Sequence, residues 1–187
     1  MSGDGGRRQL HEQLSVLYDD LRTACFNKKY YGRQLTIARR SNNATEFILA
    51  ITASGTGIGS WEAFQAGIGH DVWVALATAS ALIAILKPIV KLADRVERYA
   101  KLHGEYSKLF ATLQSVAGQV RMNQSFTPEL QKVHQTAQAT FSKLADDDDP
   151  SPSARVLKEL QRQVNEEIPA DRLWLPGNHA QKKHAQD

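Results

Sequence analysis

Residues 41–86 contain no lysine and no arginine, although the chain of 187 residues carries 23 of them. This stretch holds two apolar segments, residues 47–61 and 72–86, joined by a short polar connection. Each segment has about 15 uncharged residues, or about 22 Å of helix. A helix that crosses the core of a bilayer needs about 20 apolar residues. Because neither apolar segment reaches this length, two structures remain open: a short membrane hairpin, or a helical hairpin buried in a soluble bundle.

The placement of charge favours the membrane hairpin. Basic residues precede and follow it, whereas its connection carries only Glu62, His70 and Asp71 as ionisable side chains. Lysine and arginine near spanning segments stay on the cytoplasmic side. We therefore expect a membrane location with both termini cytoplasmic, and a hairpin buried in protein would need no such asymmetry. The flanking basic residues are Lys28, Lys29, Arg33, Arg39, Arg40, Lys87, Lys91, Arg95, Arg98 and Lys101.

The composition offers little for chemistry. Cys25 is the single cysteine, which excludes an internal disulfide and a cysteine-based zinc cluster, and we expect a small buried residue there. The six histidines share no ligand spacing, so we expect no metal, no cofactor and no enzyme activity. A net charge of +3 is mildly basic and lies beside the apolar segments, which favours anionic lipid over nucleic acid as a partner. Met1 to Arg8 precede no apolar run, so we expect no secretory signal there.

Apolar residues at steps of three and four predict long amphipathic helices on both sides of the hairpin. The first stripe runs from Gln9 to Ala38, after a start at residues 1–8 for which no helix is expected. The second runs from Ile89 to Val120 and predicts a coiled-coil-like helix that returns antiparallel to the first. Pro88 is expected to kink the chain there or to mark the membrane interface.

Two shorter helices are predicted after the return helix. Thr127 and Pro128 form a start signal, and four aspartates at residues 146–149 with two prolines behind them form a stop. We expect the acidic run to be a solvated linker or to dock on basic residues of a neighbour. Ser153 is a candidate cap for the last helix. The inward residues expected for the first of these two helices are Leu130, Val133, Ala137, Phe141 and Leu144.

The fold class that follows is all-α, with a membrane helical hairpin of two transmembrane helices that continues into long cytoplasmic antiparallel helices. The predicted segments are a cytoplasmic N-terminal helix (residues 1–40), the two-span hairpin (41–91), the cytoplasmic return helix (92–125), a C-terminal helical subdomain of two short helices (126–176) and a flexible tail (177–187).

Small residues gather in both apolar segments. Gly55 and Gly59 have the spacing that lets helix backbones approach closely in lipid, and Thr52 and Thr56 lie one turn apart beside them. The second segment carries Thr78 and Ser80 among alanines. Packing within one hairpin and packing between protomers both fit this pattern.

These features resemble the SLATT family, the two-transmembrane effectors found beside nucleotide-signalling and other sensor proteins in bacterial conflict systems. The resemblance covers about residues 10–175 and is carried by Tyr30, Tyr31 and Gly32, by the two apolar segments and by the return helix at residues 92–106. It implies an oligomeric effector that forms a pore and depolarises or permeabilises the inner membrane during phage infection. It also implies a partner sensor or nucleotide-signal protein, and no part of this chain resembles a nucleotide-binding sensor domain.

A single hairpin cannot enclose a water path, so conduction would require a homo-oligomer. We expect acidic rings at Glu46 and at Glu62 or Asp71 to favour cations, although Glu46 can instead pair with Arg39 or Lys87. The predicted pore or packing residues are Glu46, Thr52, Gly55, Thr56, Gly59, Glu62, Asp71, Thr78, Ser80 and Lys87. The predicted oligomer contacts are Leu14, Leu17, Leu21, Val96, Tyr99, Tyr106 and Leu109. The alternatives are a non-conducting membrane scaffold that recruits partners through its cytoplasmic helices, and a soluble helical adaptor.

Overall fold

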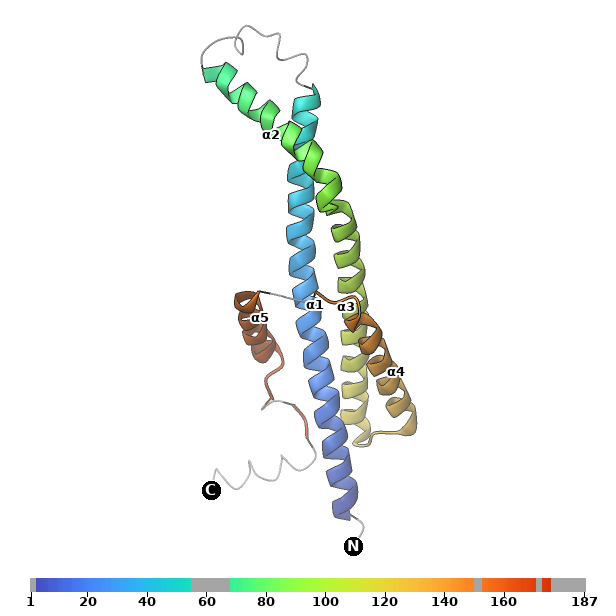
Figure 1. Ribbon diagram of the computed structural model, residues 1–187. Helices are drawn as coiled ribbons and strands as arrows, with labels where there is room; N and C mark the ends of the chain where they lie inside the picture. Colours follow the sequence, from blue (N-terminus) through green and yellow to red (C-terminus); the bar gives the residue numbers. More distant parts are fainter. Residues whose placement is uncertain (1–2, 55–67, 150–152, 171–172, 176–187) are drawn as a thin grey trace, which may run out of the picture. The chain divides into compact units, whose positions relative to one another are not determined.

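The computed structural model describes residues 3–54, 68–149, 153–170 and 173–175 (Figure 1). It contains five α-helices and, within these ranges, no strand, which confirms the all-α prediction. The helices are α1 (Gly3–Ser54), α2 (Ile68–Val90), α3 (Leu92–Asn123), α4 (Pro128–Ala145) and α5 (Ala154–Glu167). The chain forms two compact units, unit 1 from Met1–Tyr31 and Lys101–Asp187, and unit 2 from Gly32–Ala100.

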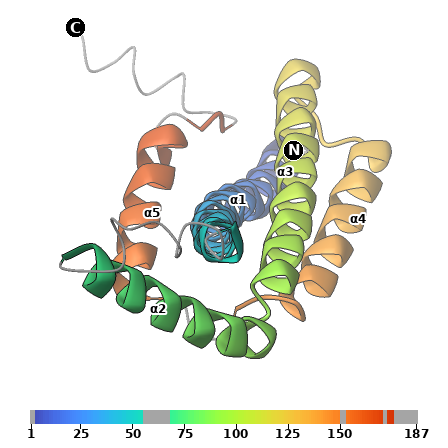
Figure 2. The same cartoon turned by 90° about the horizontal axis from the view of Figure 1, so that it is seen from above.

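Unit 1 is a helical bundle built around the first half of α1. Helix α1 lies between α5 on one side and α3 with α4 on the other (Figures 1 and 2). The stripes at three- and four-residue spacing form its core, because residues so spaced share one face of a helix. The buried apolar side chains include Leu14, Leu17, Leu21, Leu102, Tyr106, Leu113, Val116, Val120, Leu130, Ala137, Leu144, Leu160 and Val164.

The ends of the short helices follow the local sequence signals. Thr127 caps α4 in an extended conformation, and its side-chain oxygen accepts a hydrogen bond from the Leu130 amide at 3.4 Å. Pro128 takes the first helical position, where its missing N–H costs nothing. Helix α4 ends at Ala145, directly before the acidic run, and Ser153 precedes α5 as its N-cap residue. The predicted start and stop of α4 and the predicted start of α5 are therefore confirmed, although the Ser153 side chain makes no capping hydrogen bond.

Two sequence expectations about unit 1 are wrong. Helix α1 begins at Gly3, although no helix was expected before residue 9. Helix α4 buries Leu130, Ala137 and Leu144 as expected, but Val133 is 41% exposed and its neighbour His134, only 7% exposed, takes the inward position. The reason is a polar contact: His134 Nε2 lies 2.7 Å from Asp20 Oδ2 of α1. Apolar periodicity cannot anticipate a buried histidine held by a distant carboxylate.

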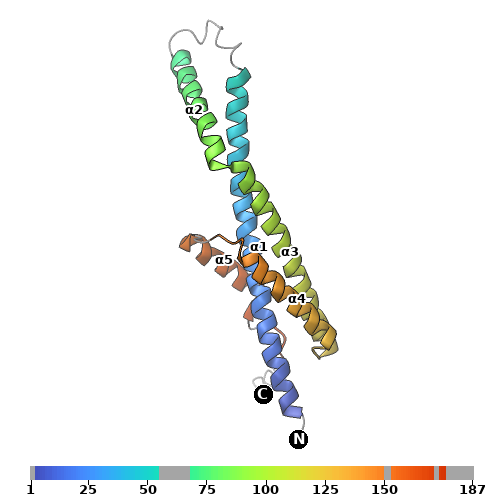
Figure 3. The same cartoon turned by 45° about the vertical axis from the view of Figure 1, so that its right-hand side comes forward.

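Unit 2 contains the second half of α1, all of α2 and the first turns of α3. Helix α2 runs back in the direction opposite to the end of α1 (Figure 3). Lys91 separates α2 from α3 with a φ of 47°, a left-handed conformation that interrupts the helix three residues after Pro88. Among the described side chains of unit 2, only Leu35, Ala38 and Ser80 are buried. This unit therefore has almost no core of its own in the part described.

Candidate functional site

Unit 2 presents an apolar surface made of Phe47 and Ile51 on α1 and Val72, Val74, Leu82 and Ile85 on α2. The exposed fractions of these side chains run from 37% at Ile51 to 67% at Phe47. Ten of the twelve α2 side chains described between Asp71 and Ile85 are exposed. Val74, Leu82 and Ile85 share one side of α2 by their helical spacing, and exposed apolar side chains that gather in this way mark sites of contact with protein or lipid. The described side chains of the hairpin are thus mostly exposed.

None of the described helices has the combination of length and apolarity required to cross a membrane.

The predicted pore residues that the structure describes lie on α1 and α2. Glu46 is exposed on α1, and Asp71 is exposed in the first turn of α2. Thr78 is exposed, and its hydroxyl donates to the Val74 carbonyl at 2.8 Å. Ser80 is buried, and its hydroxyl has no hydrogen-bond partner among the described residues. The side chains of Thr52 and Lys87, and the whole of Gly55, Thr56, Gly59 and Glu62, lie outside what the structure describes.

The predicted oligomer contacts are mostly used inside the chain. Leu14, Leu17, Leu21, Tyr106 and Leu109 are buried in the core of unit 1, because the helix faces that carry them pack against one another. A contact between copies through these five side chains would require that core to open. Val96 and Tyr99 are half-buried and belong to unit 2.

A cluster of three tyrosines and two aspartates joins α1, α3 and the α4–α5 linker in unit 1. The Tyr31 hydroxyl donates to Asp148 Oδ1 at 2.8 Å, and the Tyr106 hydroxyl contacts the same oxygen at 2.9 Å. Tyr30 donates to Asp149 Oδ2 at 3.0 Å, and the Asp149 amide donates to the Tyr31 hydroxyl at 3.0 Å. The Tyr31 and Tyr106 rings stack with centroids 5.6 Å apart. One carboxylate therefore ties two helices together through their buried tyrosines.

This tyrosine–aspartate cluster was missed by sequence reasoning. The sequence points to Tyr30 and Tyr31 through the family resemblance and to Tyr31 also through the apolar stripe, and it predicts that the acidic run is a solvated linker or docks on basic residues of a neighbour. Asp146 and Asp147 are indeed exposed, and Lys101 Nζ lies 3.4 Å from Asp147 Oδ2. Asp148 and Asp149 are instead half-buried. No local signal could have shown this, because 117 residues separate Tyr31 from Asp148.

Burial raises the pKa of both Tyr31 and Tyr106, and the hydrogen bonds to the negatively charged Asp148 raise it further. The Asp149 amide acts in the opposite direction on Tyr31, because its N–H donates to the phenol oxygen. Both hydroxyl groups are therefore held in the protonated, donating form that the carboxylate needs.

We expect the free energy of unfolding to fall as the pH rises above about 10, the pKa of an unperturbed tyrosine. The unfolded chain loses these two protons at lower pH than the folded chain, so rising pH favours unfolding. The contribution is complete below pH about 10 and is then lost at up to about 1.4 kcal/mol per pH unit for each tyrosine. Urea denaturation of the full chain, followed by circular dichroism between pH 8 and 11, measures this slope. The Tyr31→Phe/Tyr106→Phe variant should show a shallower fall, and equal slopes would contradict the assignment.

Asp20 and Cys25 are two further titratable groups in the core region of unit 1. Asp20 Oδ2 also accepts a hydrogen bond from Gln138 Nε2 at 3.0 Å, so it links α1 to α4 twice. Cys25 is 1% exposed, as expected, and burial raises its pKa, as does the nearby Glu167. A buried thiol with a raised pKa is a poor nucleophile. Within the described ranges no group of histidine, cysteine, aspartate and glutamate side chains has the arrangement of a metal site.

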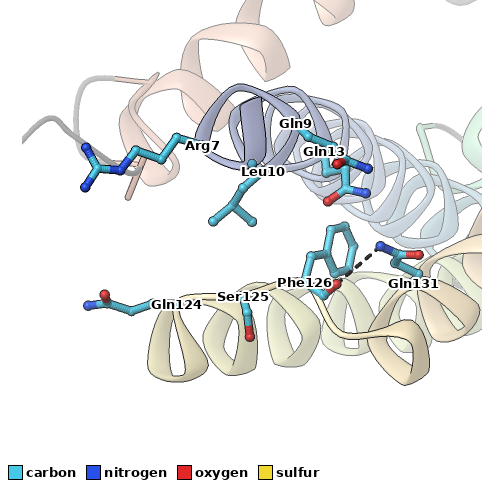
Figure 4. Close-up of a pocket in the computed structure, with 9 residues that line it drawn as sticks. Arg7, Gln9, Leu10, Gln13, Gln124, Ser125, Phe126 and Gln131 are labelled. Carbon is cyan, nitrogen blue, oxygen red and sulfur yellow. Dashed lines mark hydrogen bonds between the residues drawn. The ribbon is translucent and has the colours of Figure 1, made fainter. Parts of the chain in front are cut away.

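A groove of about 390 Å³ lies in unit 1 where the start of α1 meets the turn between α3 and α4. Figure 4 shows Leu10 of α1 facing Phe126, with Gln131 donating to the Phe126 carbonyl at 3.2 Å. The remaining lining is Gly6, Arg7, Gln9, Gln13, Gln124 and Ser125. This lining has one cation and no acid, base or nucleophile in mutual contact, so it presents no catalytic arrangement.

Comparison of the chain with models of protein families, with curated proteins and with solved structures finds no match. Its function is therefore inferred from its residue pattern and its geometry.

Proposed function

We propose that this chain is a membrane effector whose copies assemble through the hairpin into a pore that depolarises or permeabilises the bacterial inner membrane. The observation that carries the proposal is the apolar surface of unit 2, which the described part of the chain leaves exposed. The SLATT-like order of elements supports a role as the killing arm of an anti-phage system. A sensor or nucleotide-signal protein would then supply the trigger.

The energetics of the apolar surface support a lipid environment. Burying one large aliphatic or aromatic side chain is worth about 1.5–3 kcal/mol. The six side chains of the apolar surface are on average about half exposed, so about 5–9 kcal/mol is gained when they are covered. Unit 2 has almost no core to offset this cost in water. Lipid around the hairpin, with neighbouring copies packed against it, removes the penalty.

A pore would need more than one copy of the hairpin. Two helices cannot surround water, so a conducting path requires several copies. In this proposal Thr52, Gly55, Thr56, Gly59, Thr78 and Ser80 pack the helices or line the path, and Glu46 with Asp71 or Glu62 places acidic rings at its ends. Glu46 and Asp71 are exposed in the single chain, as residues at a lumen would be. Lys87 stands at the inner mouth or in the headgroup layer.

The test begins with fractionation and ends with ion flux. We expect the full chain to sediment with membranes and to need detergent for extraction. Reconstituted in liposomes, with the trigger protein where one is required, it should release a trapped ion. Gly55→Leu/Gly59→Leu should reduce the flux at least tenfold by separating the packed helices. Gly5→Leu/Gly118→Leu is the matched control, because both glycines lie in unit 1 with open space around them.

Two results would count against this proposal. Recovery of the chain in the soluble fraction without detergent would remove the membrane location and favour the adaptor. Membrane recovery and assembly with no flux under any trigger would remove the pore, and the non-conducting scaffold would take its place. Equal flux from the two glycine double variants would remove the packing argument alone.

A further inference from the structure

Unit 2 carries six exposed basic side chains, Arg33, Arg39 and Arg40 on α1 and Lys91, Arg95 and Arg98 around the start of α3. We call them the basic surface. Arg33 and Arg40 lie seven residues apart on α1, and Arg95 and Arg98 lie three residues apart on α3, with Lys91 directly before that helix. Each group therefore shares one helix face.

The basic side chains of unit 1 show a different pattern, because many of them have partners within the protein. Lys29 Nζ lies 2.7 Å from Glu167 Oε2, and Lys28 Nζ lies 4.6 Å from the centre of the Phe110 ring. In unit 2, by contrast, no ion pair of Arg33, Arg39, Arg40, Lys91 or Arg95 is found among the described residues.

The basic surface also lies at a set distance from the apolar surface. Arg40 precedes Phe47 by seven residues of α1, which is about 10 Å at helical rise. Lys91 follows Ile85 by six residues, or about 9 Å. The headgroup layer on each side of a bilayer core is about 5–8 Å thick. With the apolar surface in the hydrocarbon core, Arg40 and Lys91 fall in or next to the headgroup layer, within a Debye length of its phosphates.

We propose that the basic surface binds the phosphate headgroups of anionic phospholipids. The inference rests on the proposed membrane location and adds the lipid class that the unit selects. The exposed acids of this end of unit 2 are Glu46, Asp94 and Glu97, so cations outnumber them two to one. Asp94 lies within one turn of Lys91 and Arg98, which leaves Arg33, Arg39, Arg40 and Arg95 without an acid three or four residues away. Of these four, Arg39 and Arg40 lie nearest the apolar surface along the chain.

The experiment uses the full chain in a neutral detergent and measures its thermal unfolding with added phosphatidylglycerol, phosphatidylcholine or inorganic phosphate. We expect phosphatidylglycerol alone to raise the melting temperature. In the quadruple variant Arg33→Gln/Arg39→Gln/Arg40→Gln/Arg95→Gln, the phosphatidylglycerol concentration that gives half of the maximal shift should rise at least tenfold. Each basic residue near an anionic lipid surface contributes about fivefold to the binding constant. Raising the salt to 0.5 M should weaken the wild-type response as well.

The matched control removes four exposed cations from unit 1, Lys132→Gln/Lys143→Gln/Arg155→Gln/Lys158→Gln. It should respond to phosphatidylglycerol as the wild type does. An equal response of the two quadruple variants would overturn the proposal, as would a response to phosphatidylcholine or to inorganic phosphate that matches the phosphatidylglycerol response. Recovery in the soluble fraction would instead be a failure of the membrane location. Membrane recovery without a phosphatidylglycerol response would overturn the lipid-binding surface alone.

Discussion

Replacing Leu82 by arginine should lower the equilibrium constant for insertion of the chain into membranes by about two orders of magnitude. Leu82 is 56% exposed on α2 and belongs to the apolar surface. An arginine at the centre of a spanning helix costs about 3 kcal/mol relative to an apolar residue, and 1.4 kcal/mol is a factor of ten in an equilibrium. Extraction of membranes with alkaline carbonate, followed by blotting of both fractions, measures the effect.

The control for this prediction is Met122→Arg. Met122 is 82% exposed on α3 in unit 1, so it is another apolar side chain in contact with solvent, placed outside the hairpin. It should leave insertion unchanged, because an exposed arginine in water carries no desolvation cost. If Leu82→Arg inserts as well as Met122→Arg, the apolar surface faces water or a protein, and the lipid environment proposed for it is wrong.

The second large effect is expected at Asp148. Asp148→Ala should lower the free energy of unfolding of the full chain by about 3 kcal/mol, because it leaves two buried tyrosine hydroxyls without their acceptor. Tyr31 is 1% exposed and Tyr106 is fully buried, so water cannot easily replace the carboxylate. Urea denaturation in detergent, followed by circular dichroism, measures the loss.

Two variants make this prediction specific. Asp146→Ala removes an exposed aspartate from the same acidic run and should change the stability by no more than about 0.5 kcal/mol. The triple variant Tyr31→Phe/Tyr106→Phe/Asp148→Ala should lose far less unfolding free energy than the sum of the losses measured for Asp148→Ala and for Tyr31→Phe/Tyr106→Phe. The reason is that both partners of the hydrogen bonds are absent from the triple variant. Additive losses, or equal effects of Asp146→Ala and Asp148→Ala, would show that the cluster does not stabilise the bundle.

The helices themselves could be predicted from short-range patterns. The stripes of α1 and α3, the cap at Thr127 and the stop at the acidic run all act within one or two helical turns, and the structure places both ends of α4 where they predict. The errors arise where a distant side chain intervenes. His134 takes the inward position of α4 that was expected for Val133, because Asp20 lies opposite it.

The sequence by itself determined that the chain is helical, where its short helices begin and end, and that a cation-free apolar stretch stands between two basic ones. Only the tertiary structure decided which faces the bundle buries, that the described part of α2 is left uncovered, and that Asp148 joins Tyr31 to Tyr106. The physical reason is the separation along the sequence between the residues that interact. Periodicity and capping depend on neighbours a few residues away, whereas a hydrogen bond across 117 residues depends on where the α4–α5 linker returns to α1.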